Sequence, residues 1–157
     1  MQRVTNCILE DKEKGQVLML KKPRRGWYVA PGGKMESGEH IKQSASREFY
    51  EETGLTVDDP ELRGVFTFVM KEGENVVQEW MMFTFYAEQH SGHLLEESPE
   101  GELEWVSLNE VLKKPMAEGD RKYFEHILNS NEQVYGTFTY TTDFQLIDVV
   151  LDPASPS

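Results

Sequence analysis

The segment from residue 38 to residue 53 constrains the fold most, because both ends of a helix are marked and the charges between them are unusual. Ser37 is suited to cap the first turn, and Gly54 stands where glycine commonly ends a helix. At about 100° per residue, Glu48 and Glu52 fall on the apolar side of this helix rather than opposite it. The pattern predicts a helix that turns carboxylates toward the interior.

Three glutamates of this helix, Glu48, Glu51 and Glu52, stand at i, i+3 and i+4 and form one cluster. An acidic run is usually a solvated helix face, but a solvated face would lie opposite the apolar stripe. Carboxylates on the buried side need compensation, and oxygen ligands without His or Cys indicate Mg²⁺ or Mn²⁺. Since protein-bound Mg²⁺ is usually completed by substrate phosphates, the cluster indicates a phosphate-bearing substrate. Glu48 is also suited to act as a general base.

The residues around the cluster match a known signature. The chain reads Gly33, five residues, Glu39, seven residues, Arg47-Glu48-Phe49, one residue, Glu51-Glu52, one residue and Gly54-Leu55. This 23-residue pattern resembles the complete signature of the Nudix hydrolases, with every fixed position filled. The resemblance implies an α/β fold, a Nudix-type α/β/α sandwich with a mixed β-sheet. It also implies an enzyme that acts on phosphoric anhydrides, in which water attacks phosphorus while metal ions neutralise the developing charge.

The resemblance further implies roles for individual residues. The implied catalytic residues are Glu48, Glu51 and Glu52. The implied metal ligands are the Gly32 carbonyl, Glu48, Glu51, Glu52 and Glu100. Glu100 is chosen among five loop glutamates because it lies five residues before Trp105, as in the branch described next; a solvated acidic loop is the alternative. The residues implied to give structural support are Gly33, Glu39, Arg47 and Gly54.

Beyond the signature, the chain is similar to the branch that hydrolyses oxidised purine nucleoside triphosphates, such as 8-oxo-dGTP, to the monophosphate and pyrophosphate. Segments along nearly the whole chain, from Lys21-Lys22 to Ile147-Asp148, fall in matching order and spacing. The phosphate contacts that this similarity suggests are Lys22, Arg24, Arg25 and Lys34. The suggested base contacts are Asn6, Trp27, Tyr28 and Asp120. Core packing is the alternative for Trp27 and Tyr28.

The suggested base pocket departs from that branch. Where the branch commonly has Trp and a neighbouring acidic pair, this chain has Ala117 and Gly119-Asp120, and where it often has Asn, this chain has Tyr28. Hydrolysis of nucleoside diphosphate sugars or dinucleotides is therefore an alternative. A non-catalytic nucleotide-binding regulator with the Nudix fold is another, although such proteins typically lose the glutamates that this chain keeps.

The net charge and the cysteine content limit which partners and which cellular location we expect for the protein. The 16 Lys and Arg against 28 Asp and Glu give a net charge of −12, which disfavours polymeric nucleic acid or an anionic membrane as a partner. A small nucleotide stays compatible, because a bound divalent cation reverses the local charge. With a single cysteine, Cys7, and no apolar run near the roughly 18 residues of a membrane span, we expect a cytoplasmic protein. Monomer and homodimer are both open.

The 157 residues fit one domain, placed at residues 1–152, with a frayed tail at 153–157. Apolar alternation and turn residues predict strand pairs at 4–9 with 16–20, 62–70 with 76–87, and 134–140 with 144–151. A short strand is predicted at 105–106, and a helix at 120–129. Ser107 and Glu110 stand at the spacing of a capping box, which predicts a short helix there. Loops are expected around Gly32 and Gly33.

Overall fold

A computed structural model describes residues 1–154, so residues 155–157 of the predicted tail lie outside the described residues. The helical elements are α1 (Ile41–Thr53), the 3₁₀ turn η1 (Val111–Lys113) and α2 (Glu118–Asn129). The strands are β1 (Gln2–Asp11), β2 (Gln16–Lys21), β3 (Tyr28–Val29), β4 (Gly32–Lys34), β5 (Leu55–Asp58), β6 (Glu61–Glu72), β7 (Asn75–Ala87), β8 (Gln89–Gly92), β9 (Glu102–Ser107), β10 (Val134–Thr141) and β11 (Leu146–Asp152).

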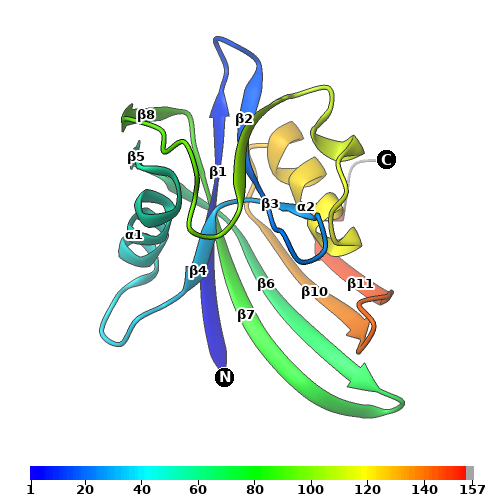
Figure 1. The fold of residues 1–157 in the computed structure, drawn as a ribbon. Helices are drawn as coiled ribbons and strands as arrows, with labels where there is room; N and C mark the ends of the chain where they lie inside the picture. The colour runs from blue at the N-terminus through cyan, green and yellow to red at the C-terminus, as the bar shows by residue number, and fades with distance from the viewer. Residues whose placement is uncertain (155–157) are drawn as a thin grey trace.

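Nine of these strands form one mixed sheet (Figure 1). The order is β11-β10-β6-β7-β1-β2-β3, with β4 added to β1 and β9 added to β2. β1 runs parallel to β7 and β10 runs parallel to β6, whereas the hairpin pairs β1–β2, β6–β7 and β10–β11 are antiparallel. The three predicted strand pairs are therefore confirmed.

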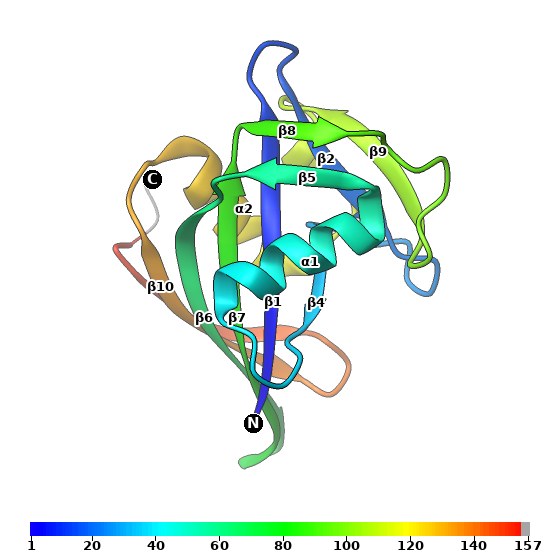
Figure 2. The ribbon, with the colours of Figure 1, turned by 90° about the vertical axis from the view of Figure 1, so that its left-hand side faces the viewer.

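The two α-helices cover opposite faces of the sheet (Figure 2). Alternate residues of β1 face opposite ways, as a strand requires: Cys7 packs into the core beside α1, while Ile8 packs into the core beside α2. Phe49 is the fully buried anchor of α1, and Tyr123 and Phe124 anchor α2. The predicted α/β/α sandwich with a mixed sheet is confirmed. Within residues 1–154, no helix is long and apolar enough to cross a membrane.

The start of α1 corrects one prediction and its end confirms another. Ser37 does not cap the helix; His40 does, through its Nδ1 accepting from the Gln43 amide at 3.1 Å. The chain before His40 forms a turn, in which the Glu39 side chain accepts from the Glu36 amide, and this delays the helix to Ile41. Gly54 ends the helix at φ 81°, and a Cβ there would lie 2.4 Å from the His93 carbonyl oxygen, so only glycine fits.

Three further local predictions differ from the structure. The predicted capping box at Ser107 and Glu110 is absent from the described chain, where Glu110 makes no side-chain cap and η1 is a single 3₁₀ turn. α2 begins at Glu118, two residues before the predicted start, with Ala117 as its N-cap residue. The expected loop at Gly32 contains strand β4, because its backbone pairs with β1.

Candidate active site

The end of α1 brings two glutamates against the backbone of β4. Glu52 is 5% exposed, and its Oε1 accepts a hydrogen bond from the Gly32 amide at 3.1 Å. The Glu48 carboxylate lies against Gly33, where a Cβ would stand 2.5 Å from Glu48 Oε2. The structure thus brings Glu48, Glu52, Gly32 and Gly33 together, and the absence of a side chain at Gly33 makes room for a carboxylate.

Arg47 links the loop before α1 to the acidic helix face. Its guanidinium donates to both carboxylate oxygens of Glu39, at 2.6 and 3.0 Å, and holds the pKa of Glu39 down to about 2. Its Nη1 also donates to Glu48 and to Glu51, each at 3.0 Å. The expected pairing of Glu39 with Arg47 therefore forms. Within residues 1–154, no three acidic, His or Cys side chains converge on one point, and Glu51 points outward with 54% of its side chain exposed.

Several charged groups surround the Glu52 carboxylate. Burial raises its pKa to about 7; Lys22 and the Gly32 amide oppose this shift, and the negative charges of Glu48 and Glu100 add to it. The Lys22 ammonium lies 3.5 Å from a carboxylate oxygen of Glu100, which brings this loop glutamate into the surroundings of Glu52. Carboxylates are the hard oxygen ligands that a divalent cation prefers, so the chemistry of these donors fits one, although their side chains do not converge on one point within residues 1–154.

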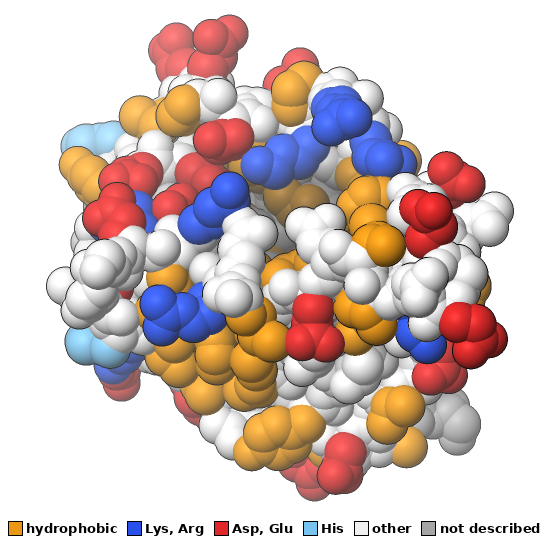
Figure 3. Space-filling view, turned by 90° about the horizontal axis from the view of Figure 1, so that it is seen from below, with side chains coloured by type: hydrophobic (Ala, Val, Ile, Leu, Met, Phe, Trp, Pro, Cys, Tyr) orange, Lys and Arg blue, Asp and Glu red, His pale blue; other side chains and the backbone are white. Residues whose placement is uncertain are grey.

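Lys22 begins the basic loop between β2 and β3. The Lys22 amide donates to the Trp27 carbonyl at 2.8 Å, and the Gly26 amide donates to the Lys22 carbonyl at 2.9 Å, which closes the loop. Arg24 and Arg25 are exposed on it, and Lys34 is exposed on β4. Figure 3 shows a hollow in this face of the molecule with Lys and Arg side chains on its rim.

A buried polar cluster lies on the α2 side of the same region. Asn6 is 6% exposed, its Nδ2 donates to the Tyr123 hydroxyl at 3.2 Å, and its Oδ1 has no partner among the described residues. Asp120 lies next to Tyr123; burial raises the pKa of Asp120 to about 7, and the Tyr123 hydroxyl opposes the shift. The structure thus brings Asn6 and Asp120 together through Tyr123.

Comparisons with known proteins identify the family. The model of the NUDIX domain matches residues 1–127. The chain is 50% identical to the uncharacterized Nudix hydrolase YvcI of Bacillus subtilis over 153 aligned residues. These residues cover 98% of this chain and 96% of that protein. The chain belongs to the Nudix family. As a Nudix hydrolase it acts on phosphoric anhydrides, and enzymes of this family generally use divalent metal ions.

Two further relatives of this Nudix hydrolase bear on its fold and branch. The crystal structure of the mutator MutT protein of Bacillus halodurans has a TM-score of 0.95 at 55% identity, covering 98% of this chain and 99% of that one. The oxidized purine nucleoside triphosphate hydrolase of Danio rerio is 30% identical over 141 residues, 88% of this chain and 87% of that protein. The resemblance carried by residues 33–55 is therefore confirmed.

Two buried residues of this Nudix hydrolase, Tyr28 and Thr84, have surroundings that the sequence does not reveal. Tyr28 is buried, its hydroxyl donates to Glu104 at 2.9 Å, and Lys114 lies over its ring at 4.9 Å. The structure thus places Tyr28 in the core, while its contact with a base stays a prediction. Thr84 lies beside Asn6 in the strand register and has a buried Oγ1 without a partner among the described residues. Sequence reasoning misses Thr84 because a threonine within an aromatic strand reads as ordinary β-structure.

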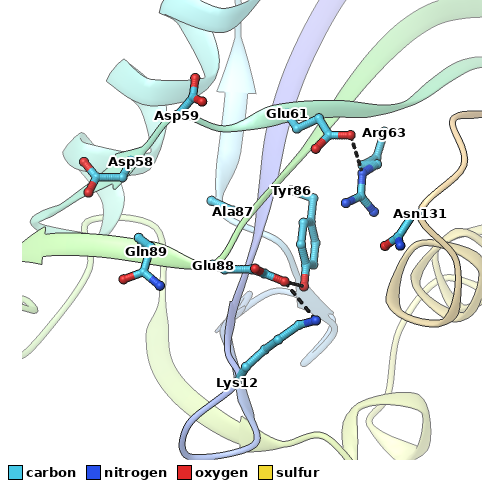
Figure 4. A pocket seen from close by; sticks show the side chains of 10 residues that line it. All are labelled: Lys12, Asp58, Asp59, Glu61, Arg63, Tyr86, Ala87, Glu88, Gln89 and Asn131. Atoms are coloured by element: carbon cyan, nitrogen blue, oxygen red, sulfur yellow. Dashed lines mark hydrogen bonds and ion pairs between the residues drawn. The ribbon is translucent and has the colours of Figure 1, made fainter.

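A separate groove of about 550 Å³ contains none of the predicted site residues (Figure 4). Both cations that line it are paired with acids of the groove: Lys12 lies 3.0 Å from Glu88, and Arg63 donates to Glu61 at 3.0 Å. The Tyr86 hydroxyl lies 2.9 Å from Glu88. Asp58 and Asp59 add further negative charge, so the described residues of this groove offer no unpaired cation to a phosphate.

Proposed function

We propose that this Nudix hydrolase cleaves purine nucleoside triphosphates, including oxidised ones such as 8-oxo-dGTP, to the monophosphate and pyrophosphate. One strand pairing carries the proposal: Asn6 of β1 lies directly opposite Gly32 of β4, and the Gly32 amide donates to Glu52. The polar cluster on the α2 side and the carboxylates at the end of α1 therefore meet at a single residue pair. A nucleotide whose base lies near Asn6 has its phosphates beside the carboxylates.

The residues that would hold Mg²⁺, or Mn²⁺ in its place, are Glu48, Glu51, Glu52, the Gly32 carbonyl and Glu100. When bound, the cation supplies positive charge to the phosphate oxygens as negative charge develops there. Lys22, beside Glu52 and Glu100, is placed to contact a phosphate, with Arg24 and Lys34 as further cations. Glu48, oriented by Arg47, accepts the proton of the attacking water.

The base is held on the other side of the Asn6–Gly32 pair. Asn6 Oδ1, free of protein partners in the described chain, accepts from the purine edge, and Asp120 provides a second polar contact. The similarity to the hydrolase of Danio rerio supports this substrate class. Because Ala117 provides no aromatic ring and Gly119 provides no second carboxylate, we expect weak discrimination between 8-oxo-dGTP and dGTP.

We further propose that residues 1–152 act as one domain on free nucleotides. The cytoplasmic location stays a prediction.

A substrate screen with product analysis tests this proposal. Purified protein with Mg²⁺ is assayed against unmodified and oxidised nucleoside triphosphates, nucleoside diphosphate sugars and dinucleotides, with Glu52→Gln as the inactive control. We expect pyrophosphate and the monophosphate from purine triphosphates, because attack falls on an internal phosphorus. Orthophosphate as the first product, or a higher kcat/KM for a sugar or dinucleotide substrate, would overturn the proposal. Binding without turnover of any substrate would indicate a regulator.

A further inference from the structure

The turn between β10 and β11 carries an aromatic ring to the basic loop, which lies far from it in the sequence. The Phe144 ring meets the Trp27 ring edge-on, with centroids 5.9 Å apart. The guanidinium carbon of Arg25 lies over both rings, 4.9 Å from the Trp27 centroid and 4.6 Å from the Phe144 centroid. The planar guanidinium of Arg25 thus contacts both aromatic rings at the surface of the protein.

The backbone at Phe144 is held in a conformation that this residue type rarely adopts. Its φ is 61°, in the left-handed region that favours glycine. The turn is fixed by hydrogen bonds from the Phe144 amide to the Thr141 carbonyl (3.0 Å), from the Thr141 amide to the Gln145 carbonyl (2.9 Å), and from the Gln145 amide to Thr141 Oγ1 (3.1 Å). Bulky residues kept in such strained conformations concentrate at ligand-binding sites.

Contacts link these two rings to residues at both ends of the proposed substrate site. On one side, the Phe144 ring packs against Tyr140 at 5.8 Å, and the Tyr140 hydroxyl accepts from the Gly119 amide at 2.7 Å, next to Asp120. On the other side, the Trp27 carbonyl accepts from the amide of Lys22, the proposed phosphate contact. Contacts therefore connect the two rings to the surroundings of both Asp120 and Lys22, the two ends of the proposed site.

Core packing does not account for the two rings. Both Trp27 and Phe144 are only half-buried. Trp27 belongs to neither hydrophobic cluster of the described chain, whereas Phe144 touches the edge of one. Each ring therefore keeps an open surface, and nucleobases stack on exposed aromatic faces regardless of base identity.

We propose that Phe144 and Trp27 form a stacking wall for the nucleobase, in which the base stacks on the Phe144 face and meets the Trp27 ring, which stands at 79° to Phe144, with its edge. This makes Phe144 a substrate-contacting residue that determines affinity for purine nucleotides. This inference rests on the proposed function and extends it to a residue outside the Nudix signature. The Arg25 guanidinium lies over the two rings, where a planar base would stack. Because Arg25 is an exposed loop residue, its side chain can move aside when the base binds.

Binding of two probes that differ only in the base tests the wall. Titration calorimetry without metal compares dGMP with deoxyribose 5-phosphate on the wild type, Phe144→Ala, Phe144→Leu and Phe144→Tyr. We expect Phe144→Ala to weaken dGMP binding by at least about fivefold, Phe144→Leu to weaken it also, and Phe144→Tyr to restore it. Deoxyribose 5-phosphate should bind all four within about twofold, since it has no ring to stack. Tyr135→Ala, an exposed ring elsewhere on β10, is the matched control and should bind both probes as the wild type does.

Several outcomes would overturn the wall. If Phe144→Ala binds dGMP as the wild type does but melts at a lower temperature, the ring has a purely structural role. If the variant weakens the binding of dGMP and deoxyribose 5-phosphate equally, the ring acts on phosphate binding rather than on the base. Phe144→Gly suits the left-handed backbone and supplies the ring deletion if the alanine variant does not fold. In turnover, the wall predicts a higher KM for dGTP with kcat within about twofold. If the wild type binds dGMP through Phe144 but hydrolyses no purine triphosphate, the proposed function is contradicted while the stacking wall is not.

Discussion

Replacing Asp120 by Asn tests whether this carboxyl keeps its proton in the folded protein. Burial raises its pKa to about 7, opposed by the Tyr123 hydroxyl, whereas an unfolded aspartate has a pKa of about 3.9. Between about pH 4 and about pH 7, the folded protein therefore holds a proton that the unfolded chain has released. Raising the pH through this window favours the unfolded chain, so the contribution of Asp120 to the free energy of unfolding falls.

The size of the effect follows from this one proton. A difference of one bound proton changes the free energy of unfolding by about 1.4 kcal/mol per pH unit. Because the Asp120 side chain is partly accessible, water reduces this effect, and we expect a loss of roughly 2 kcal/mol across the window. Asn has the same shape and does not ionise. The variant should therefore match the wild type near pH 4 and exceed it by roughly 2 kcal/mol above pH 7.

Urea unfolding followed by tryptophan fluorescence measures this difference at steps between about pH 4 and about pH 8, with chelator present. Glu118→Gln is the matched control on the same helix: its carboxylate is 63% exposed, so its pH profile should follow that of the wild type. A stability difference between Asp120→Asn and wild type that stays constant across the pH range would refute the reasoning.

Three further predictions concern the carboxylate site and the pocket. Glu52→Gln should lower kcat at saturating Mg²⁺ by at least about 100-fold, and in chelator it should melt no lower than the wild type because one crowded charge is gone; near-normal turnover would contradict the metal assignment. Gly33→Ala places a Cβ 2.5 Å from Glu48 Oε2, so kcat should fall about tenfold or more with an unchanged circular dichroism spectrum. Asp120→Ala should raise KM for 8-oxo-dGTP about tenfold, through loss of a hydrogen bond to a polar base edge. A lower melting temperature with unchanged KM would remove Asp120 from the pocket.

The parts of the fold that sequence predicts are those with a repeating pattern. Alternation along β6 and the helical placement of Glu48 and Glu52 report burial directly, because period 2 and period 3.6 fix which side chains share a face. The start of α1 has no such signal. Ser37 and His40 both precede the helix, and the choice of His40 depends on a turn whose Glu39 is held by Arg47. Tertiary contact therefore decided this cap, not local propensity.

The sequence does not reveal the strand β4 or the buried polar cluster around Asn6, for a related reason. Gly32 and Gly33 have no side chains to alternate, so their pairing with β1 leaves no pattern in the sequence. On α2, the spacing of Tyr123 indicates a core position, and the residue is indeed buried. Its hydroxyl nevertheless accepts from Asn6, a contact between segments far apart in the chain that spacing does not reveal.

The departure at Gly119 has a physical cause that only the packing shows. The Tyr140 hydroxyl accepts from the Gly119 amide at 2.7 Å, and a Cβ at this position would lie 2.5 Å from that hydroxyl and 2.9 Å from Phe138. The space for a side chain at residue 119 is already filled from β10, so a second acid cannot stand beside Asp120 while Tyr140 is in place. Weak selectivity for the oxidised base is therefore expected to follow from Tyr140 as much as from Gly119. The ring that excludes the acid also supports Phe144, so the same packing that removes one base contact positions the proposed stacking wall.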